Sequence, residues 1–202
     1  MDRITKAFID TNVLVSAIVF GGTPLRGLEL AVKEDVEVVV STYVVDELYE
    51  VLRRRFPSAA AIGGKALEWL SPTVVSSPSR DEWCNYLGVL TDEKDLPILV
   101  AALKAGVQVL VSGDQGFHKP EIGRLLPVYD ASRFFATLYS NRAMKQASYS
   151  KLPDGGFCGR VPPCTGVIAF AHTLEGCRKE LFSVLLDWVL LGLQMGHTLP
   201  DI

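Results

Sequence analysis

Four carboxylates lie at points of the sequence where strand-like and helix-like patterns meet. In a parallel sheet the carboxyl ends of the strands and the amino ends of the following helices share one edge, where ligands bind. Acids gathered at that edge repel one another unless some stay protonated or a divalent cation lies between them. Hard oxygen ligands favour Mg²⁺ or Mn²⁺ over zinc. The four acids are Asp10, Glu47, Asp95 and Asp114.

Each of the four acids also has an ordinary structural explanation. Asp10 could close a strand in an Asx turn, and Asp95 could cap a helix. Asp114 could belong to a solvated loop, and Glu47 to an exposed helix face. Because all four fall in order at equivalent positions of an alternating pattern, we predict a shared metal site.

The elements that must position these acids alternate between short β-branched runs and helical patterns. This alternation predicts an α/β fold with a mainly parallel sheet covered on both faces. The expected strands are residues 6–10, 36–41, 73–77, 107–114 and 126–130, and the expected helices are residues 13–20, 23–34, 42–56, 58–71, 95–106 and 131–139.

A different pattern begins near residue 141. Residues 145–173 are typical of an antiparallel meander, and a long helix follows from Leu174 to about Met195, capped by Thr173. We therefore predict two domains, residues 1–140 and a small α+β domain at residues 141–202. The helix is apolar on more than one stripe, so we expect a contact between copies of the chain; the alternative is that the whole width is intramolecular core.

At the four acids the sequence resembles the PIN-domain family, including its VapC-like toxins. The resemblance covers residues ~5–139 and rests on FIDTNVLVSA, VVDELYEVL, DEKDLPILVAAL and VLVSGDQGF. It implies a Rossmann-like α/β/α sandwich with a Mg²⁺- or Mn²⁺-dependent nuclease that usually cuts single-stranded RNA. Many members are the toxins of toxin–antitoxin pairs.

The same resemblance implies roles for individual residues. The four acids become catalytic metal ligands, Asn12 orients Asp10, and Ser112 supports Asp114, with a hydroxyl where many members have threonine. A metal-bound water would be the nucleophile, so no nucleophilic side chain is needed. Asp92 and Glu93 are candidate outer ligands, or members of a solvated loop.

Contacts to an RNA backbone would come from basic groups near the acids. The nearest in sequence are Lys94, Lys119 and Arg124. Arg53–Arg55 end a helix, where basic residues also complement the helix dipole. His118 could touch a phosphate or lie on a loop surface.

The C-terminal segment resembles the HicB family of antitoxins. The resemblance runs from Leu152 to Ile202 and rests on an Asp-Gly-Gly turn, a Pro-centred strand, a helix start and a final Leu-Pro; Gly176 stands where a second acid is common. It implies a β-β-β-α-β, partial RNase H-like fold that neutralises a toxin ribonuclease. No DNA-binding tail follows Ile202, so we do not expect operator binding.

The composition of the chain limits which classes of function and location are expected. The net charge of −3 gives no overall attraction to nucleic acid, and four cysteines without C-x-x-C spacing indicate reduced thiols. The N-terminus shows no signal peptide, and the apolar segment 181–196 is short and carries Asp187, so we expect a cytoplasmic protein. The leading hypothesis is an endoribonuclease that acts on single-stranded or structured RNA, with a cognate toxin or antitoxin as a possible partner. The alternative is a non-catalytic RNA- or protein-binding module with a structural metal site.

Overall fold

The structure, a computed structural model, describes residues 3–202. Met1 and Asp2, with which the predicted first domain begins, lie outside the described residues. The chain forms two compact units, residues 4–134 and residues 135–202 with Arg3. The units divide within one helix, between Phe134 and Phe135. The predicted domain boundary after residue 140 stays a prediction, since compactness alone does not define where a family's domain ends.

The first unit is built on a five-stranded parallel sheet in the order β3-β2-β1-β4-β5. The strands are short and mostly apolar; β1 and β4, in the middle of the sheet, are almost wholly buried, as expected for strands covered on both faces, whereas the edge strand β3 is largely exposed. The strands are β1 (Lys6–Ile9), β2 (Glu37–Ser41), β3 (Thr73–Val75), β4 (Val109–Val111) and β5 (Val128–Tyr129).

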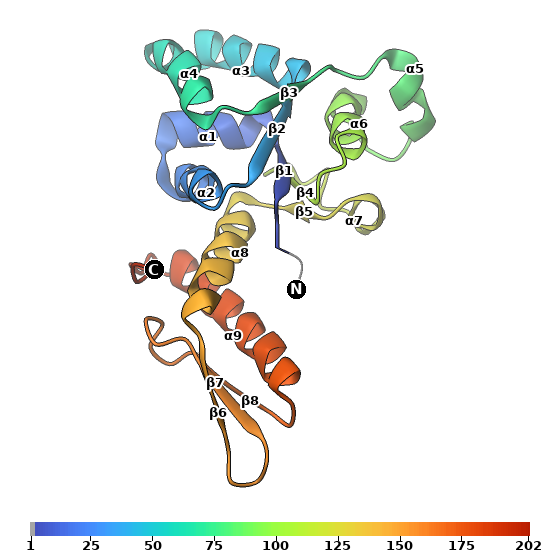
Figure 1. Ribbon diagram of the computed structural model, residues 1–202. Coiled ribbons are helices and arrows are strands. Elements are labelled where there is room, and N and C mark those ends of the chain that lie inside the picture. Colours follow the sequence, from blue (N-terminus) through green and yellow to red (C-terminus); the bar gives the residue numbers. More distant parts are fainter. Residues whose placement is uncertain (1–2) are drawn as a thin grey trace. The chain divides into compact units, whose positions relative to one another are not determined.

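Helices cover the two faces of this sheet, with α1 to α4 on one side and α6 and α7 on the other (Figure 1). This distribution follows from right-handed crossovers that move outward from β1 in both directions. The helices are α1 (Thr11–Phe20), α2 (Gly22–Lys33), α3 (Thr42–Arg55), α4 (Pro57–Leu70), α5 (Arg80–Trp83), α6 (Leu96–Lys104) and α7 (Pro120–Leu125), with 3₁₀ turns at Cys84–Tyr86 and Glu93–Asp95.

The core of the first unit lies between the sheet and its helices. Phe8 and Ile9 of β1 are fully buried, as are Leu48 of α3 and Leu99 of α6. Fully burying a side chain of this size contributes about 1.5–3 kcal/mol. The core therefore fixes the strands whose ends carry the acids. The predicted α/β/α sandwich is confirmed.

The second unit contains a three-stranded antiparallel sheet in the order β6-β7-β8, with α9 packed on β7 and β8. Gly159 of β7 permits this packing, because a Cβ there would lie 3.0 Å from Cys177 Sγ and 3.1 Å from Leu181 Cδ2. The elements are α8 (Ala131–Ala143), which spans the division, a 3₁₀ turn at Met144–Gln146, β6 (Ser148–Lys151), β7 (Phe157–Arg160), β8 (Ile168–Ala171) and α9 (Leu174–Gln194).

The start of α9 agrees with the prediction, whereas the segment after its end does not. Thr173 caps the helix by accepting a hydrogen bond from the Gly176 backbone N–H at 3.0 Å, as predicted. The last strand implied by the HicB resemblance is not formed, since residues 195–202 are irregular. They are tied to α8 instead, because the Tyr139 hydroxyl donates to the Pro200 carbonyl at 2.7 Å.

The helix α9 was predicted to be apolar on more than one side. Most of these apolar residues are buried within the chain itself. Seven residues of the helix are buried, on both of the expected stripes: Cys177, Leu181, Phe182, Leu185, Leu186, Val189 and Gly192. Leu191 and Met195 are the large apolar residues of this helix end that stay exposed, at 55% and 60%.

A test of length and hydropathy finds no single helix among the described residues that could cross a membrane. Only the bent pair Thr11–Phe20 and Gly22–Lys33 passes it, when its two helices are joined across a bend of 107°.

Candidate active site

Asp10 and Ser112 meet at the carboxyl edge of the sheet because β1 and β4 are neighbours. Ile9 pairs with Val111, and the Asp10 backbone N–H donates to the Val111 carbonyl at 3.0 Å. One carboxylate oxygen of Asp10, Oδ2, accepts the Ser112 hydroxyl at 2.5 Å. The other, Oδ1, accepts the Thr11 backbone N–H at 2.7 Å, which makes Asp10 the cap of α1. Asp10 is only 4% exposed, so its carboxylate is held in one place.

Asn12 acts on the loop that carries Asp114. Its Nδ2 donates to Ser112 Oγ at 3.3 Å, and its Oδ1 accepts the Gly113 N–H at 3.1 Å. The Asp114 N–H also donates to Ser112 Oγ, at 3.1 Å. Asn12 therefore reaches Asp10 through the Ser112 hydroxyl in this arrangement. The predicted orienting role of Asn12 stays a prediction, with Ser112 as the intermediate.

Glu47 is positioned by Thr11, the residue that follows Asp10 in the sequence. The Thr11 hydroxyl donates to Glu47 Oε2 at 2.5 Å, joining the start of α1 to the second turn of α3. Thr11 is buried and Glu47 half-buried. The side-chain role of Thr11 had no signal in the sequence beyond its place beside Asp10.

Asp95 and Asp114 approach each other across Gly116. The Gly116 N–H donates to Asp114 Oδ1 at 2.6 Å. A Cβ on Gly116 would lie 3.0 Å from Asp114 Oδ1 and 3.9 Å from Asp95 Oδ2. The absence of a side chain at Gly116 therefore leaves room for both carboxylates on this side of the site.

Burial raises the pKa of Asp10 from 3.8 to about 7, even though the hydrogen bonds from Ser112 and Thr11 lower it. Repulsion from Glu47 and Asp95 adds to the rise. Burial likewise raises the pKa of Asp95 to about 6, followed by repulsion from Asp114, Asp92 and Glu47. Each of the four acids therefore repels at least one of the others, and their assignment to one metal site stays a prediction.

The donor set is compatible with a hard divalent cation. Among residues 3–202 no group of three or more His, Cys, Asp or Glu side chains is already gathered closely enough to hold a metal. The side chains at this edge are nevertheless carboxylates, and the pKa values of Asp10 and Asp95 are raised chiefly by burial, with a further rise from repulsion by neighbouring acids. Carboxylate oxygens are the ligands that hard divalent cations prefer, so the chemistry of these side chains is compatible with such an ion.

The remaining predicted residues belong to the segment before α6 and to the start and end of α7. Asp92 is exposed and accepts the Lys94 N–H at 3.0 Å, which caps the 3₁₀ turn containing Glu93. The Lys119 ammonium donates to the Thr91 hydroxyl. Lys94, Glu93 and Arg124 are exposed.

His118 and the arginines at the end of α3 have structural partners. His118 Nε2 lies 2.8 Å from the Ser112 carbonyl oxygen and so braces the loop of the site. Arg53 Nε donates to the Tyr49 carbonyl at 3.2 Å, and Arg54 pairs with Glu50 at 3.9 Å. These contacts within α3 agree with the helix-end alternative for Arg53 and Arg54.

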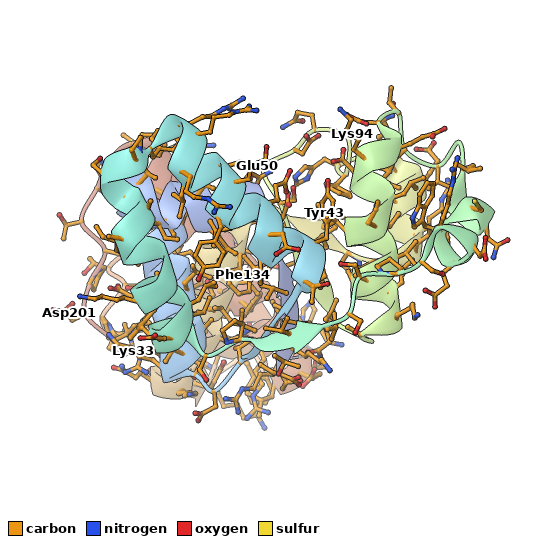
Figure 2. All side chains as sticks on the ribbon, turned by 90° about the horizontal axis from the view of Figure 1, so that it is seen from above. Lys33, Tyr43, Glu50, Lys94, Phe134 and Asp201 are labelled. Atoms are coloured by element: carbon orange, nitrogen blue, oxygen red, sulfur yellow. The ribbon has the colours of Figure 1, made fainter. Side chains whose placement is uncertain are left out.

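Tyr43 is a residue of this edge that the sequence reading missed. It lies one turn before Glu47 on α3, and Figure 2 shows it between α3 and α6. Burial raises the pKa of Tyr43, and repulsion from Glu47, Asp95 and two further acids adds to the rise. Its spacing of four from Glu47, on one helix face, is the signal that could have identified it.

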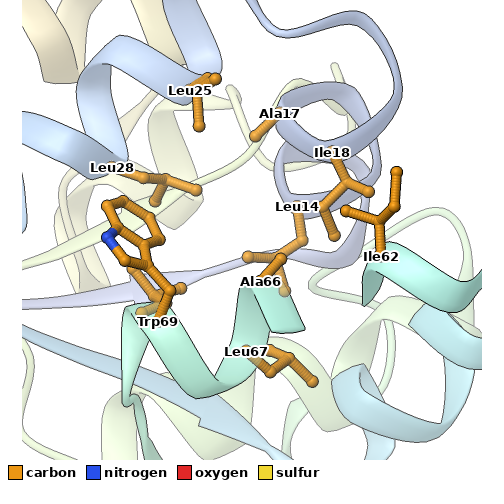
Figure 3. Close-up of a pocket in the computed structure, with 10 residues that line it drawn as sticks. Leu14, Ala17, Ile18, Leu25, Leu28, Ile62, Ala66, Leu67 and Trp69 are labelled. Atoms are coloured by element: carbon orange, nitrogen blue, oxygen red, sulfur yellow. The ribbon is translucent and has the colours of Figure 1, made fainter. Parts of the chain in front are cut away.

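A cavity of about 160 Å³ lies between α1, α2 and α4, away from the acids (Figure 3). It contains no ionisable side chain, so it offers apolar contact and no acid–base or metal chemistry. Its lining is Leu14, Ala17, Ile18, Leu25, Leu28, Ile62, Ala66, Leu67, Trp69 and Leu70.

Two solved bacterial structures are among those similar to the chain. The chain is similar to TTHA0281 from Thermus thermophilus, with 35% identity, coverage of 32% of this chain and 84% of that one, and a TM-score of 0.31. It is also similar to VapBC2 from Rickettsia felis, solved bound to a DNA fragment from their promoter, with 20% identity, coverage of 62% and 98%, and a TM-score of 0.47. No curated protein matches the chain at a significant level.

Family models match both parts of the chain. Residues 138–200 match the UPF0150-like family, to which HicB-like antitoxins belong, so the predicted C-terminal resemblance is confirmed. Residues 6–116 match the PIN domain. Because this second match spans more than half of the residues and contains all four acids, the chain belongs to the PIN-domain family.

Proposed function

We propose that this protein is a Mg²⁺- or Mn²⁺-dependent endoribonuclease of a toxin–antitoxin system. PIN domains are generally nucleases. The observation that carries the proposal is the buried Asp10 carboxylate, fixed by Ser112 and Thr11 and repelled by Glu47 and Asp95. A cluster of carboxylates without a positive partner attracts a divalent cation. The bound cation can in turn bind the phosphodiester that is to be cut.

The chain's own groups orient the ligands. Ser112 and Thr11 hold the two oxygens of Asp10, and the Thr11 hydroxyl holds Glu47. Asp114 is fixed by its own loop through Gly116. A bound divalent cation would supply a water of lowered pKa and would offset charge on the phosphate oxygens.

Exposed basic residues support an RNA substrate. Lys94 is the middle residue of the 3₁₀ turn Glu93–Asp95 before α6, and Lys119 and Arg124 lie at α7. We assign them to contacts with the RNA backbone, single-stranded or structured, and Asp92 to an outer position around the metal. Such contacts would be weakened by salt, because they rest on phosphate charge.

The C-terminal unit supports a partner in the same system. Its similarity to UPF0150-like proteins suggests that it restrains the nuclease, binds a cognate toxin or antitoxin, or assembles copies of the chain. We place the protein in the cytoplasm, where its RNA substrates are.

The deciding experiment is cleavage of labelled single-stranded RNA by the full chain with Mn²⁺, with Mg²⁺ or with a chelator. We expect cleavage with the metals only, and a loss of at least about 100-fold for Asp10→Asn and Glu47→Gln. Asp46→Asn is the matched control, because Asp46 precedes Glu47 on α3 and its side chain is not one of the predicted ligands. Single-stranded DNA of the same sequence tests the preference for RNA.

The alternative is a non-catalytic binding module with a structural metal, and it predicts the opposite result in the cleavage experiment. RNA would then be bound but not cut, and Asp10→Asn would leave binding unchanged. Cleavage that survives Asp10→Asn and Asp114→Asn would show that another site acts and would overturn the assignment.

A further inference from the structure

Tyr43 is placed beside the acids by the geometry of α3. Residues four apart lie on the same face of a helix, one turn from each other, so Tyr43 adjoins Glu47. Burial of the phenol raises the pKa of Tyr43, and repulsion from Glu47, Asp95, Asp92 and Asp10 adds to the rise. Figure 2 shows Tyr43 on the side of α3 that faces α6.

The backbone that carries Tyr43 is held in place. The Tyr43 N–H donates to Ser77 Oγ at 2.8 Å. The hydroxyl of the preceding Thr42 lies 2.7 Å from the same Ser77 Oγ and accepts the Ser77 N–H at 3.1 Å. These three contacts tie the first turn of α3 to the segment after β3, so the ring projects from a fixed point.

The phenol itself is a donor without a protein acceptor. Tyr43 is not fully exposed, and its hydroxyl makes no hydrogen bond with any residue in the described range 3–202. The ordinary pKa of a tyrosine hydroxyl is about 10, so the O–H is protonated throughout the neutral range. In the free protein water must take its hydrogen bond.

We propose that the Tyr43 hydroxyl donates a hydrogen bond to a non-bridging oxygen of the substrate phosphate next to the acid cluster. This assignment rests on the proposed nuclease function and makes Tyr43 a substrate-binding residue of the same site. A neutral O–H suits the position because it can approach a phosphate oxygen and tolerates nearby carboxylates, whereas a lysine there would form a permanent pair with Glu47.

The test compares three full-length variants on a short single-stranded RNA with Mn²⁺. Tyr43→Phe removes only the hydroxyl, Tyr43→Leu also removes the ring, and Tyr49→Phe is the control. Tyr49 lies on the same helix, and its ring contacts the α4 side at Gly63. Binding of the same RNA with Ca²⁺ in place of Mn²⁺, followed by fluorescence anisotropy, gives a readout that does not depend on cleavage.

We expect Tyr43→Phe to lower kcat/KM by about 10- to 100-fold and to weaken RNA binding, with an unchanged melting temperature. Tyr49→Phe should match the wild type. If Tyr43→Phe equals the wild type while Tyr43→Leu fails, the ring stacks on a base and the hydroxyl assignment is wrong. If both equal the wild type, Tyr43 has no role.

The two proposals fail in different ways. A wild-type chain that cuts no RNA would overturn the nuclease function, and the Tyr43 assignment with it. A wild-type chain that cuts RNA beside a fully active Tyr43→Phe variant would overturn the Tyr43 assignment alone.

Discussion

Ser112 donates its hydroxyl hydrogen to Oδ2 of Asp10 at 2.5 Å, across the carboxyl ends of two adjacent parallel strands. The Ser112 hydroxyl oxygen in turn accepts hydrogen bonds from Asn12 Nδ2 and from the Asp114 backbone N–H. One fully buried hydroxyl thus joins two residues of the first strand's end to a loop about a hundred positions away in the chain. The hydroxyl is the point at which the buried side of the acid cluster is fixed.

Replacing Ser112 by alanine should loosen the site and destabilise the fold. Asp10 Oδ2 would keep no donor in a buried position, and Asn12 would lose its acceptor, so we expect a loss of about 1–3 kcal/mol in the free energy of unfolding. Urea denaturation at pH 7 measures this loss. Ser112→Thr keeps the hydroxyl and should retain both stability and cleavage. Equal stability of Ser112→Ala and the wild type would contradict the role of the hydroxyl.

Stability without metal should fall as the pH rises from about 4 to about 7. The pKa of Asp10 is 3.8 in the unfolded chain and about 7 in the fold, so within this window the native state binds more protons than the unfolded state. By linkage the free energy of unfolding then decreases with pH, by at most about 4 kcal/mol for this group. Thermal melts in a chelator across this range measure the slope.

Asp10→Asn isolates this contribution, because an amide has no proton to lose. The variant should be more stable than the wild type at pH 7.5, and the difference should vanish near pH 4. Asp46→Asn serves as the control outside the cluster and should keep the wild-type slope. Parallel curves for Asp10→Asn and the wild type would mean that Asp10 is not the group that titrates.

Much of the site could be predicted because each acid follows a local pattern. Asp10 comes after an apolar strand, and Asp95 comes directly before a helix with proline near its start. Parallel topology then brings such ends to one edge. The long-range order of the strands is not local, but it follows from the alternation of strands and helices and from right-handed crossovers.

Other contacts could not be predicted, because they depend on which side chains meet across the fold. In the sequence, Thr11 stands at the turn between a strand and a helix, yet its hydroxyl donates a hydrogen bond to Glu47, 36 positions away. The sequence places Tyr43 on a helix, but it does not show that acids from other segments act on its side chain. The short helices α5 and α7 were also missed, since single turns lack the periodicity that identifies longer helices.

Gly116→Ala should lower cleavage with little effect on folding. The new Cβ would lie 3.0 Å from Asp114 Oδ1, so that carboxylate would have to shift from its present position. We expect a loss of activity of about 10- to 100-fold, as for other displacements of groups around a metal. Gly123→Ala in α7 is the control, because its Cβ meets nothing within 4 Å. Full activity in Gly116→Ala would show that Asp114 can shift without consequence.

The proposed self-association should depend on the exposed end of α9. Leu191 and Met195 are 55% and 60% exposed and lie one turn apart. The double variant Leu191→Lys, Met195→Lys should shift an assembled chain toward the monomer, because charged ammonium groups resist burial. The control Gln194→Lys adds one charge beside this surface and should leave the assembled chain unchanged. Light scattering after gel filtration measures the mass, and an unchanged mass would place the contact elsewhere.

Thr11→Val should weaken the metal site while preserving the shape of the side chain. Valine removes the hydroxyl that donates to Glu47 Oε2, so this carboxylate can turn away from Asp10 and Asp95. We expect Mn²⁺ affinity, measured by calorimetry, to fall by about 10- to 100-fold, as when a residue that orients a ligand is lost. Thr11→Ser keeps the donor and should bind Mn²⁺ as the wild type does. If Thr11→Val and Thr11→Ser bind the metal equally well, the hydroxyl contributes nothing and Glu47 is held by its helix alone.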